Sequence, residues 1–259
     1  MRIVTWNVNS IRARLDRALD WVDAQQPDVL CLQEIKCLDE QFPREPFLER
    51  GYAIETFGQK TYNGVAILSR LPMRDVRRAL PWDQDKDARG ISALIEDVRV
   101  VNLYVVNGKE VGDPKYLHKL AWLDALQAWL EAEHGPDELL CLCGDYNIAP
   151  EDIDVYDPRR WKEKILCSTP ERQRYQRLLD WGLFDAFRQL DDRPGQYSWW
   201  DTRTGGFDRG DGLRIDHLLV SRDLMEAAQQ VFIDVDERAR EHETCKPSDH
   251  APVVLDLEG

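Results

Sequence analysis

Residues 139–147 of the 259-residue chain read LLCLCGDYN, and this stretch decides the fold. Its apolar run has the length of one buried strand, and Gly144 then introduces a polar turn. Residues 29–34 read VLCLQE and repeat the pattern, because a short apolar strand again ends in a carboxylate. The helix expected before each strand is stopped by a proline, Pro27 in one case and Pro136 in the other. Two similar halves of a layered α/β fold would bring both acids to one rim, and coincidence between two buried strands is the alternative.

The remainder of the chain alternates between strands and helices, which is typical of an α/β fold. The expected strands cover residues 2–8, 62–68, 98–106, 214–220 and 252–257. The expected helices cover residues 12–25, 116–133 and 169–181, the last one preceded by Ser168 as the start of a capping box. No Gly/Ser-rich or Pro-rich tract interrupts the sequence, so we expect a single domain over residues 1–259.

The composition sets limits on partners and location. The net charge is −14, from 34 basic and 48 acidic residues, and the sequence pI is near 4.8. This charge argues against a nucleic-acid partner unless a local basic face or a bound cation overrides the overall field. No run of ~18 apolar residues is present, so we expect no membrane-spanning helix. The start of the chain does not resemble a signal peptide and the six cysteines form no Cys-x-x-Cys pair, so we expect reduced thiols in the cytoplasm.

Polar side chains recur where the expected strands end. They are Asn7, Glu34, Asp145, Asn147, Asp216, Asp249 and His250. Loops at strand ends are where a rigid scaffold presents catalytic groups. Oxygen donors with a single imidazole suit Mg²⁺ or Mn²⁺ better than Zn²⁺. Each residue taken alone is more simply explained as a turn, a cap or a surface acid, and their joint appearance favours a functional site.

This set of side chains suits the hydrolysis of a phosphodiester. A bound cation neutralises the phosphate, and a carboxylate such as Asp145 activates water as a general base. Asn147 is placed to orient that group or to donate to the transition state, and His250 paired with Asp216 can hold a proton or a positive charge against the phosphate. A structural role is expected for the other histidines and for one cysteine pair, namely His118, His134, His217, His242, Cys141 and Cys143.

Five segments, in order along the whole chain, resemble motifs of the exodeoxyribonuclease III and AP (abasic-site) endonuclease family. They are TWNVNSIR at 5–12, LQEIK at 32–36, GDYNIAP at 144–150, LRID at 213–216 and SDHAP at 248–252. The resemblance implies a four-layer α/β sandwich, in which two β-sheets pack face to face with helices outside. It also implies Mg²⁺-dependent (or Mn²⁺-dependent) cleavage of duplex DNA on the 5′ side of an abasic site, which leaves a 3′-hydroxyl. Further implied activities are 3′→5′ exonuclease action and repair of blocked 3′ ends, by a monomer.

The resemblance also assigns roles to individual residues. The implied catalytic residues are Tyr104, Asp145, Asn147, Asp216 and His250. The implied metal site comprises Asn7, Glu34, Asp145, Asn147, Asp249 and His250. The implied pocket for the abasic sugar is formed by Trp199, Leu213 and Ile215, with the neighbouring Trp200 expected to face the core. After Tyr104 the chain reads Val105-Val106-Asn107-Gly108, where some members of the family carry Phe-Pro-Gln-Gly.

A local basic track would reconcile the acidic chain with DNA, because phosphate contacts need only one positive face. The candidates near the motifs are Arg12, Arg14, Lys36, Arg89, Lys115, Lys119, Arg203 and Arg209. Two other functions remain open. One is a phosphoesterase of the same fold that acts on an inositol phosphate, a sphingolipid or non-specific DNA. The other is a catalytically inactive nucleic-acid-binding regulator.

Overall fold

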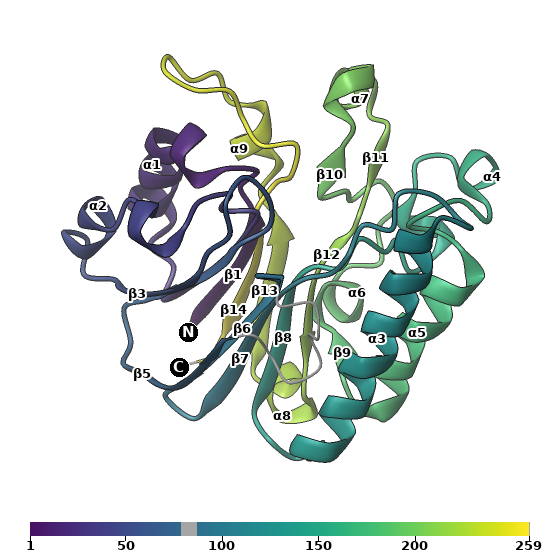
Figure 1. Ribbon diagram of the computed structural model, residues 1–259, viewed down its shortest axis with the longest axis horizontal. Helices are drawn as coiled ribbons and strands as arrows, with labels where there is room; N and C mark the ends of the chain where they lie inside the picture. Colours follow the sequence, from purple (N-terminus) through teal and green to yellow (C-terminus); the bar gives the residue numbers. More distant parts are fainter. Residues whose placement is uncertain (79–86, 259) are drawn as a thin grey trace.

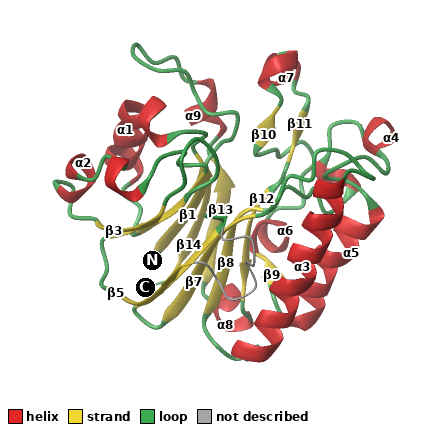
Figure 2. Ribbon diagram, in the orientation of Figure 1, coloured by secondary structure: helices red, strands yellow, loops and turns green. Residues whose placement is uncertain are grey.

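The computed structural model of the protein describes residues 1–78 and 87–258. Two six-stranded mixed sheets pack against each other, and helices cover their outer faces (Figures 1 and 2). This arrangement confirms the four-layer α/β sandwich expected from the sequence.

The strands fall into two sheets and one short hairpin. The first sheet has the order β13 (Ala228–Ile233), β14 (Val253–Leu257), β1 (Arg2–Asn7), β2 (Val29–Gln33), β4 (Val65–Ser69) and β3 (Ala53–Phe57). The second has the order β5 (Met73–Arg78), β6 (Gly90–Ile95), β7 (Val98–Tyr104), β8 (Leu140–Asp145), β12 (Asp216–Val220) and β9 (Phe184–Asp185). The hairpin pairs β10 (Trp199–Trp200) with β11 (Gly212–Leu213).

The two sheets repeat one topology. Along each order given above, the successive pairings are antiparallel, antiparallel, parallel, antiparallel and antiparallel. The strands β2 and β8 occupy the same place in this order, and each follows its parallel partner through a crossover helix, α1 (Leu15–Gln25) or α3 (Pro114–Glu133). The repeat seen at residues 29–34 and 139–147 is therefore a structural repeat.

The remaining α-helices are short, apart from α5. They are α2 (Glu45–Leu48), α4 (Pro158–Trp161), α5 (Thr169–Trp181), α6 (Ala186–Leu190), α7 (Gly206–Arg209), α8 (Arg222–Glu226) and α9 (Val235–Ala239). Single 3₁₀ turns are η1 (Ile11–Ala13), η2 (Asp39–Gln41), η3 (Asp152–Asp154) and η4 (Thr202–Thr204). The residues of the expected capping box begin α5: Glu171 accepts from both the backbone N–H and the hydroxyl of Ser168, while the N–H of Glu171 donates to the carbonyl oxygen of Ser168.

Three expected boundaries were wrong for local reasons. The helix expected over 12–25 is split, because Arg14 has a non-helical backbone (φ −125°, ψ 18°) between η1 and α1. The strand expected from residue 62 begins at Val65, because Asn63 and Gly64 both have positive φ. The strand expected from residue 214 begins at Asp216, because the preceding residues lead out of the hairpin strand β11.

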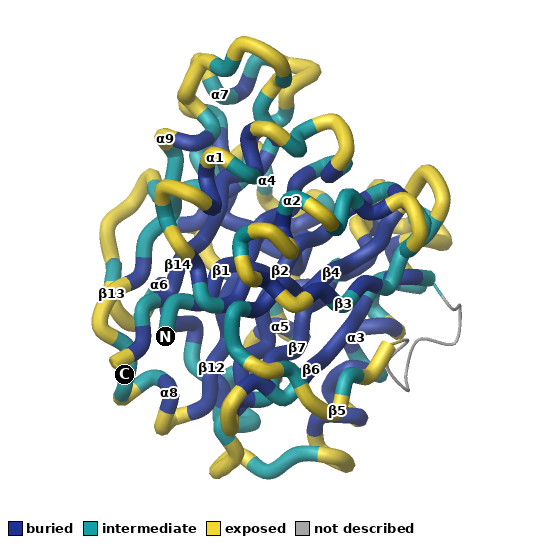
Figure 3. The backbone as a smooth tube through the Cα atoms, turned by 90° about the vertical axis from the view of Figure 1, so that its left-hand side faces the viewer, coloured by how far each residue is buried: buried dark blue, intermediate teal, exposed yellow. Residues whose placement is uncertain are grey.

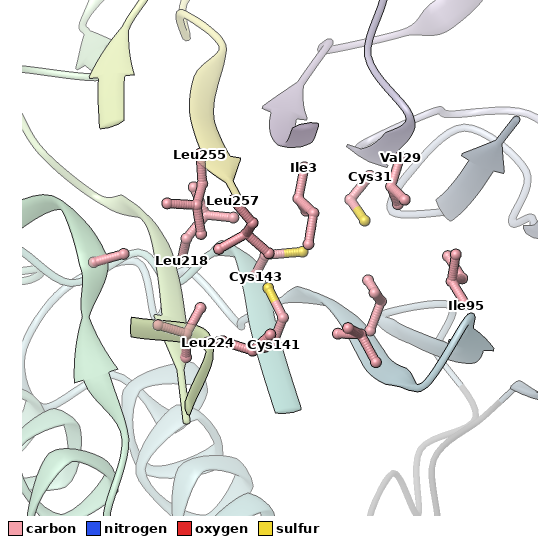
Figure 4. Close-up of a cluster of buried hydrophobic side chains, with 14 of the residues drawn as sticks. Ile3, Val29, Cys31, Ile95, Cys141, Cys143, Leu218, Leu224, Leu255 and Leu257 are labelled. Carbon is pink, nitrogen blue, oxygen red and sulfur yellow. The ribbon is translucent and has the colours of Figure 1, made fainter. Parts of the chain in front are cut away.

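The main core fills the space between the two sheets. Side chains such as Ile3 and Cys31 of the first sheet meet Cys141 and Cys143 of the second, and all four are fully buried (Figure 4). The structural role expected for the two cysteines of β8 is thereby confirmed. The strands β2, β4, β8 and β12 are buried along their whole length (Figure 3), which gives a rigid base for the loops at their ends. Among the helices in the described part of the chain, none has the length and hydropathy needed to cross a membrane.

Candidate active site

Strand register places three of the expected site residues side by side. Tyr104 ends β7 opposite Asp145 at the end of β8, and Asp145 pairs with Asp216 at the start of β12. In the first sheet, Asn7 ends β1 and Glu34 directly follows β2. One rim of the sandwich therefore carries side chains from both sheets, at the end from which the β10–β11 hairpin projects (Figure 1).

Asn7 joins the carboxylates of the two sheets. Its Nδ2 donates to Oε1 of Glu34 at 2.9 Å and to Oδ2 of Asp145 at 2.9 Å. Its Oδ1 accepts the backbone N–H of Asn9 at 3.0 Å. The two acids of the repeated strands are thus held together at one rim, as the sequence predicted, through hydrogens of the Asn7 amide.

A buried chain of ionisable groups connects Asp145 to Asp216 through His250. The His250 Nδ1 lies 2.9 Å from Oδ2 of Asp216, and its Nε2 lies 3.8 Å from Oδ2 of Asp145. Burial alone would lower the pKa of His250, but the two carboxylates outweigh it and raise the pKa to about 10. Burial raises the pKa of Asp145 to about 7, against the attraction of His250. Ser198 fixes the far carboxylate, since its Oγ donates to Asp216 at 2.6 Å.

Glu34 and Tyr104 form the opposite side of the site. Burial opposes ionisation of Glu34, but the neighbouring Lys36, with Nζ 2.7 Å from Oε2, and the Asn7 amide lower its pKa. Burial and the charge of Glu34 raise the pKa of Tyr104 well above the usual value, so its hydroxyl stays protonated as a donor. The guanidinium of Arg89 lies over the Tyr104 ring, 5.0 Å from its centroid.

The turn after β8 requires two unusual backbone conformations. Gly144 has φ 145°, and a Cβ there would lie 1.9 Å from the carbonyl oxygen of Leu103, so only glycine fits. Asn147 has φ 51°, and its backbone N–H donates to Oδ1 of Asp145 at 2.9 Å. The Asn147 amide is oriented by Asn107, whose Nδ2 donates to its Oδ1 at 2.8 Å.

The residues expected to form the sugar pocket lie together. Trp199 pairs with Leu213 across the hairpin, and Leu213 and Ile215 are buried in one small apolar cluster against which Trp199 packs. Trp199 is half-buried, whereas Trp200 is buried against Phe207, so one ring faces the site and the other the interior, as expected.

Trp199 also contacts a carboxylate of the expected metal site. Its Nε1–H donates to Oδ2 of Asp249 at 3.1 Å, while Nδ2 of Asn9 donates to Oδ1 of Asp249 at 2.8 Å. A hydrogen bond therefore joins Trp199, which is expected to form a wall of the sugar pocket, directly to Asp249.

The donor set fits a hard divalent cation. Ligand atoms of Asp145, Asp216 and His250 lie within 4.8 Å of one another. Because its raised pKa keeps His250 protonated between Asp145 and Asp216, it is a counter-charge to them and not a ligand, so a cation would be held by the carboxylates of Glu34, Asp145 and Asp249. The expected ligand set also contained Asn7 and Asn147, whose side-chain amides bond to protein groups in this structure, and it did not contain Asp216.

The assignment of Lys119 to the expected basic track was wrong. Lys119 is fully buried and paired with Glu171, so it cannot meet a DNA phosphate at the surface. Three other members, Arg89, Lys115 and Arg203, line a hollow of about 720 Å³ next to Tyr104. Arg12 and Arg209 are exposed, Lys36 pairs with Glu34, and Arg14 is half-buried.

A second buried network, behind the site, had no role in the sequence interpretation. Arg214 is fully buried, with Nε 2.7 Å from Oδ1 of Asp154 and Nη2 2.8 Å from Oδ2 of Asp185. Its Nη1 donates to Nδ1 of His217 at 2.9 Å, and His217 Nε2–H therefore donates to the carbonyl oxygen of Ile148 at 2.8 Å. The structural role expected for His217 is confirmed, and Asp216 pairs with His250 and not with Arg214. Asp154 ends η3 and Asp185 ends β9, far apart in sequence, so no sequence signal pointed to this network.

With this geometry in view, the comparisons with known proteins identify the class. The sequence model of the Endonuclease/Exonuclease/phosphatase family matches residues 4–250, and the chain belongs to this family. Among curated proteins, the chain is 40% identical over 266 residues to exodeoxyribonuclease III of Haemophilus influenzae, covering 98% of each chain. It is 30% identical over 264 residues to the DNA repair nuclease APEX1 of Danio rerio, covering 99% of this chain and 82% of that protein.

Solved structures agree. The 3′ phosphatase NExo from Neisseria, bound to a product DNA hairpin, superposes with a TM-score of 0.94 at 43% identity over 100% of both chains. An AP endonuclease from Archaeoglobus fulgidus superposes with a TM-score of 0.93 at 34% identity, again over 100% of both chains. The curated relatives are phosphodiester hydrolases of DNA repair.

Proposed function

We propose that the protein is a Mg²⁺-dependent (or Mn²⁺-dependent) DNA repair nuclease that hydrolyses the phosphodiester 5′ to an abasic site in duplex DNA. The product is a 3′-hydroxyl, and 3′→5′ exonuclease action and repair of blocked 3′ ends use the same site. The observation that carries the proposal is the buried Asp145–His250–Asp216 chain, joined through Asn7 to Glu34. The names of the relatives, exodeoxyribonuclease III and AP endonuclease, support the substrate.

In this proposal the residues of the chain share the work of in-line hydrolysis. Asp145 takes the proton of the attacking water, a role for which a pKa near neutrality is suited. Protonated His250, held by Asp216, keeps a positive charge facing the phosphate. Asn147 and the protonated hydroxyl of Tyr104 donate to phosphate oxygens. A cation bound by the carboxylates of Glu34, Asp145 and Asp249 would neutralise the phosphate and stabilise the leaving oxygen.

The deciding experiment uses a duplex with one abasic site, incubated with and without Mg²⁺, followed by analysis of the new ends. Mg²⁺-dependent incision that leaves a 3′-hydroxyl on the 5′ side supports the proposal. Tight duplex binding with no incision would favour the inactive regulator, and turnover of an inositol phosphate or sphingomyelin without DNA incision would favour another phosphoesterase. Every residue that is expected to be catalytic is present in the sequence, which argues against a catalytically inactive regulator.

Two further properties belong to this proposal. Residues 1–259 act as one domain, which is supported by a single core cluster that runs from Ile3 to Leu257. The enzyme works as a monomer in the cytoplasm, in keeping with six cysteines that form no disulfide in the described residues.

Removal of Glu34 tests the proposed metal site. Glu34→Ala is expected to raise the Mg²⁺ concentration needed for half-maximal incision by more than ~10-fold, because a charged oxygen ligand is lost. The measurement is the initial rate across a Mg²⁺ titration, with Glu40→Ala as the control, since Glu40 is exposed on the adjoining η2. An unchanged titration curve would make Glu34 a purely structural residue.

Trp199 is expected to have two separable roles. Trp199→Phe keeps an apolar ring but removes the donor to Asp249, so we expect incision to slow by ~10-fold with the preference for abasic over intact duplex retained. Trp199→Ala removes the wall as well, and both the rate and the preference should fall.

Initial rates on abasic and intact duplex, together with melting temperatures, check this expectation. Trp200→Phe is the matched control, because that ring packs in the interior and its loss should lower the melting temperature without changing the preference. If Trp199→Ala keeps the preference, or merely unfolds, the pocket wall lies elsewhere.

A further inference from the structure

Lys119 is a charged side chain buried completely behind the expected catalytic residues. It extends from α3, has no exposed surface, and its Nζ forms an ion pair with Glu171 in the first turn of α5. Replacing a buried ion pair with apolar groups is often neutral or stabilising, so the stability of a fold does not by itself require such a pair. The contacts of the ammonium group indicate what else it does.

The Lys119 ammonium group reaches the backbone of Asn147. Nζ donates to the carbonyl oxygen of Asn147 at 2.6 Å, while the N–H of the same residue donates to Asp145 at 2.9 Å. The left-handed backbone of Asn147 is therefore held on both sides, by a carboxylate on its N–H and by an ammonium on its C=O.

The same ammonium group holds the second segment that orients the Asn147 side chain. Nζ lies 3.3 Å from the carbonyl oxygen of Asn107, and the Asn107 amide donates to Oδ1 of Asn147. Nδ2 of Asn147 donates to the carbonyl oxygen of Val105 at 3.0 Å, which leaves one amide hydrogen for a ligand. Lys119 thus fixes the loops after β7 and β8 relative to each other.

The packing around the lysine stem leaves little room for the loop to shift. Gly108 has φ 91°, and a Cβ at this position would lie 3.2 Å from Cδ of Lys119 and 2.8 Å from Cδ1 of Ile165. The backbone after Asn107 therefore lies directly against the aliphatic part of Lys119.

We propose that Lys119 is a positioning residue, whose ammonium group, anchored by Glu171, holds the Asn147 amide in the orientation that the reaction uses. The consequence for turnover rests on the proposed function. The hold of Lys119 on the Asn147 backbone, called the clamp below, does not. A displacement of ~1 Å in a catalytic group is enough to lower a rate by ~10²-fold, so a rigid anchor of this kind bears directly on kcat.

The test separates positioning from simple stability with three variants. Lys119→Met removes the clamp and leaves Glu171 unpaired. Lys119→Met/Glu171→Gln also removes the uncompensated charge, while the Gln oxygen can still accept from the N–H groups of Leu166 or Ser168. Arg17→Met breaks another buried pair, Arg17 with Glu237 at 2.8 Å, which joins α1 to α9 and does not touch Asn147.

Three properties are measured for each variant and for wild type. They are the melting temperature, kcat and KM on abasic duplex, and the hydrogen exchange of the backbone amides in residues 145–149. For Lys119→Met we expect a lower melting temperature, kcat reduced by ~10- to 100-fold with KM close to wild type, and faster exchange in 145–149. The double variant should recover melting temperature but not kcat. Arg17→Met should lose melting temperature while kcat and exchange in 145–149 stay unchanged.

Two outcomes would overturn the inference. If kcat recovers together with melting temperature in the double variant, Lys119 is a structural residue only. If exchange in 145–149 rises no more in Lys119→Met than in Arg17→Met, the clamp does not hold the loop. Failure of the wild-type protein to incise abasic duplex would instead refute the proposed function, and the exchange comparison would still decide the role of Lys119.

Discussion

Asp145→Asn is expected to reduce incision of abasic duplex by at least ~10²–10⁴-fold, the contribution of a general base. The substitution removes the proton acceptor, and it also places an amide nitrogen or a neutral oxygen where Oδ2 now accepts from Asn7 and faces His250. Duplex binding should change little, because we expect the phosphate contacts at the hollow lined by Arg89, Lys115 and Arg203 and not at Asp145.

The measurement pairs single-turnover incision rates with binding of uncleaved abasic duplex in the presence of Ca²⁺, an ion of the same charge. Asp152→Asn is the matched control, because this exposed acid begins η3, which follows the same strand, and forms an ion pair with Arg172. We expect that control to incise at the wild-type rate. Near-normal turnover by Asp145→Asn would remove Asp145 from the proposed mechanism.

The sequence was most informative where local patterns determine geometry. The apolar runs before Glu34 and Asp145 predicted two equivalent strands. Register places the end of each strand beside that of its parallel partner, and the packing of the two sheets brings both ends to one rim. Boundaries failed where single backbone conformations decide them, as at Arg14 and Asn63. Such conformations depend on tertiary contacts that no residue pattern contains.

The position of Lys119 within the helical pattern already indicates that its side chain is buried. It follows Tyr116 by three residues and precedes Leu123 by four, and both of these, with Leu126, are buried on the inner face of α3. A lysine at the apolar spacing of a helix is either a break in the pattern or a buried charge with a partner. The partner Glu171 lies in α5, and only the packing of the two helices reveals the pair.

Internal pairs such as Arg214 with Asp185 cancel in charge and leave the net charge of −14 unchanged, so a DNA substrate requires a local group of basic side chains. Arg89, Lys115 and Arg203 line one hollow, where Arg89 and Arg203 also pair with Asp87 and Asp201. The local field at the site, and not the total of −14, decides whether a polyanion approaches.

Arg214→Met is expected to give the largest loss of stability. Arg214 is fully buried and binds Asp185 through two nitrogens, at 2.8 and 3.1 Å, so its removal leaves a buried carboxylate without its main counter-charge. Breaking a buried pair in this way costs about 3–5 kcal/mol. For a domain of this size, that loss should lower the melting temperature by roughly 6–20 °C.

The pH dependence identifies Asp185 as the source of this loss. Burial opposes ionisation of Asp185, but Arg214 outweighs it and lowers the pKa to about 2. A carboxyl whose folded pKa is depressed stabilises the fold fully above its unfolded pKa of ~3.9 and loses that contribution as pH falls towards the folded value. In Arg214→Met the burial of Asp185 is uncompensated and raises its folded pKa, so the difference in unfolding free energy between wild type and variant should begin to shrink as pH falls through that raised pKa and should continue to shrink down to about pH 2.

Urea unfolding across this pH range, with two companion variants, completes the argument. Arg222→Met removes an exposed guanidinium from the start of α8, beyond the other end of β12, and should change stability by less than ~0.5 kcal/mol. Arg214→Met/Asp185→Asn removes one stranded charge but keeps an oxygen for the Tyr175 hydroxyl and for the N–H groups of α6, so it should regain part of the loss and reduce the pH dependence. The remaining pH dependence comes from Asp154, whose pKa Arg214 also lowers and which still pairs with Arg188. A loss that is independent of pH down to 2, or unrelieved by the second substitution, would mean that Arg214 acts through packing of its long side chain and not through the buried charges it pairs.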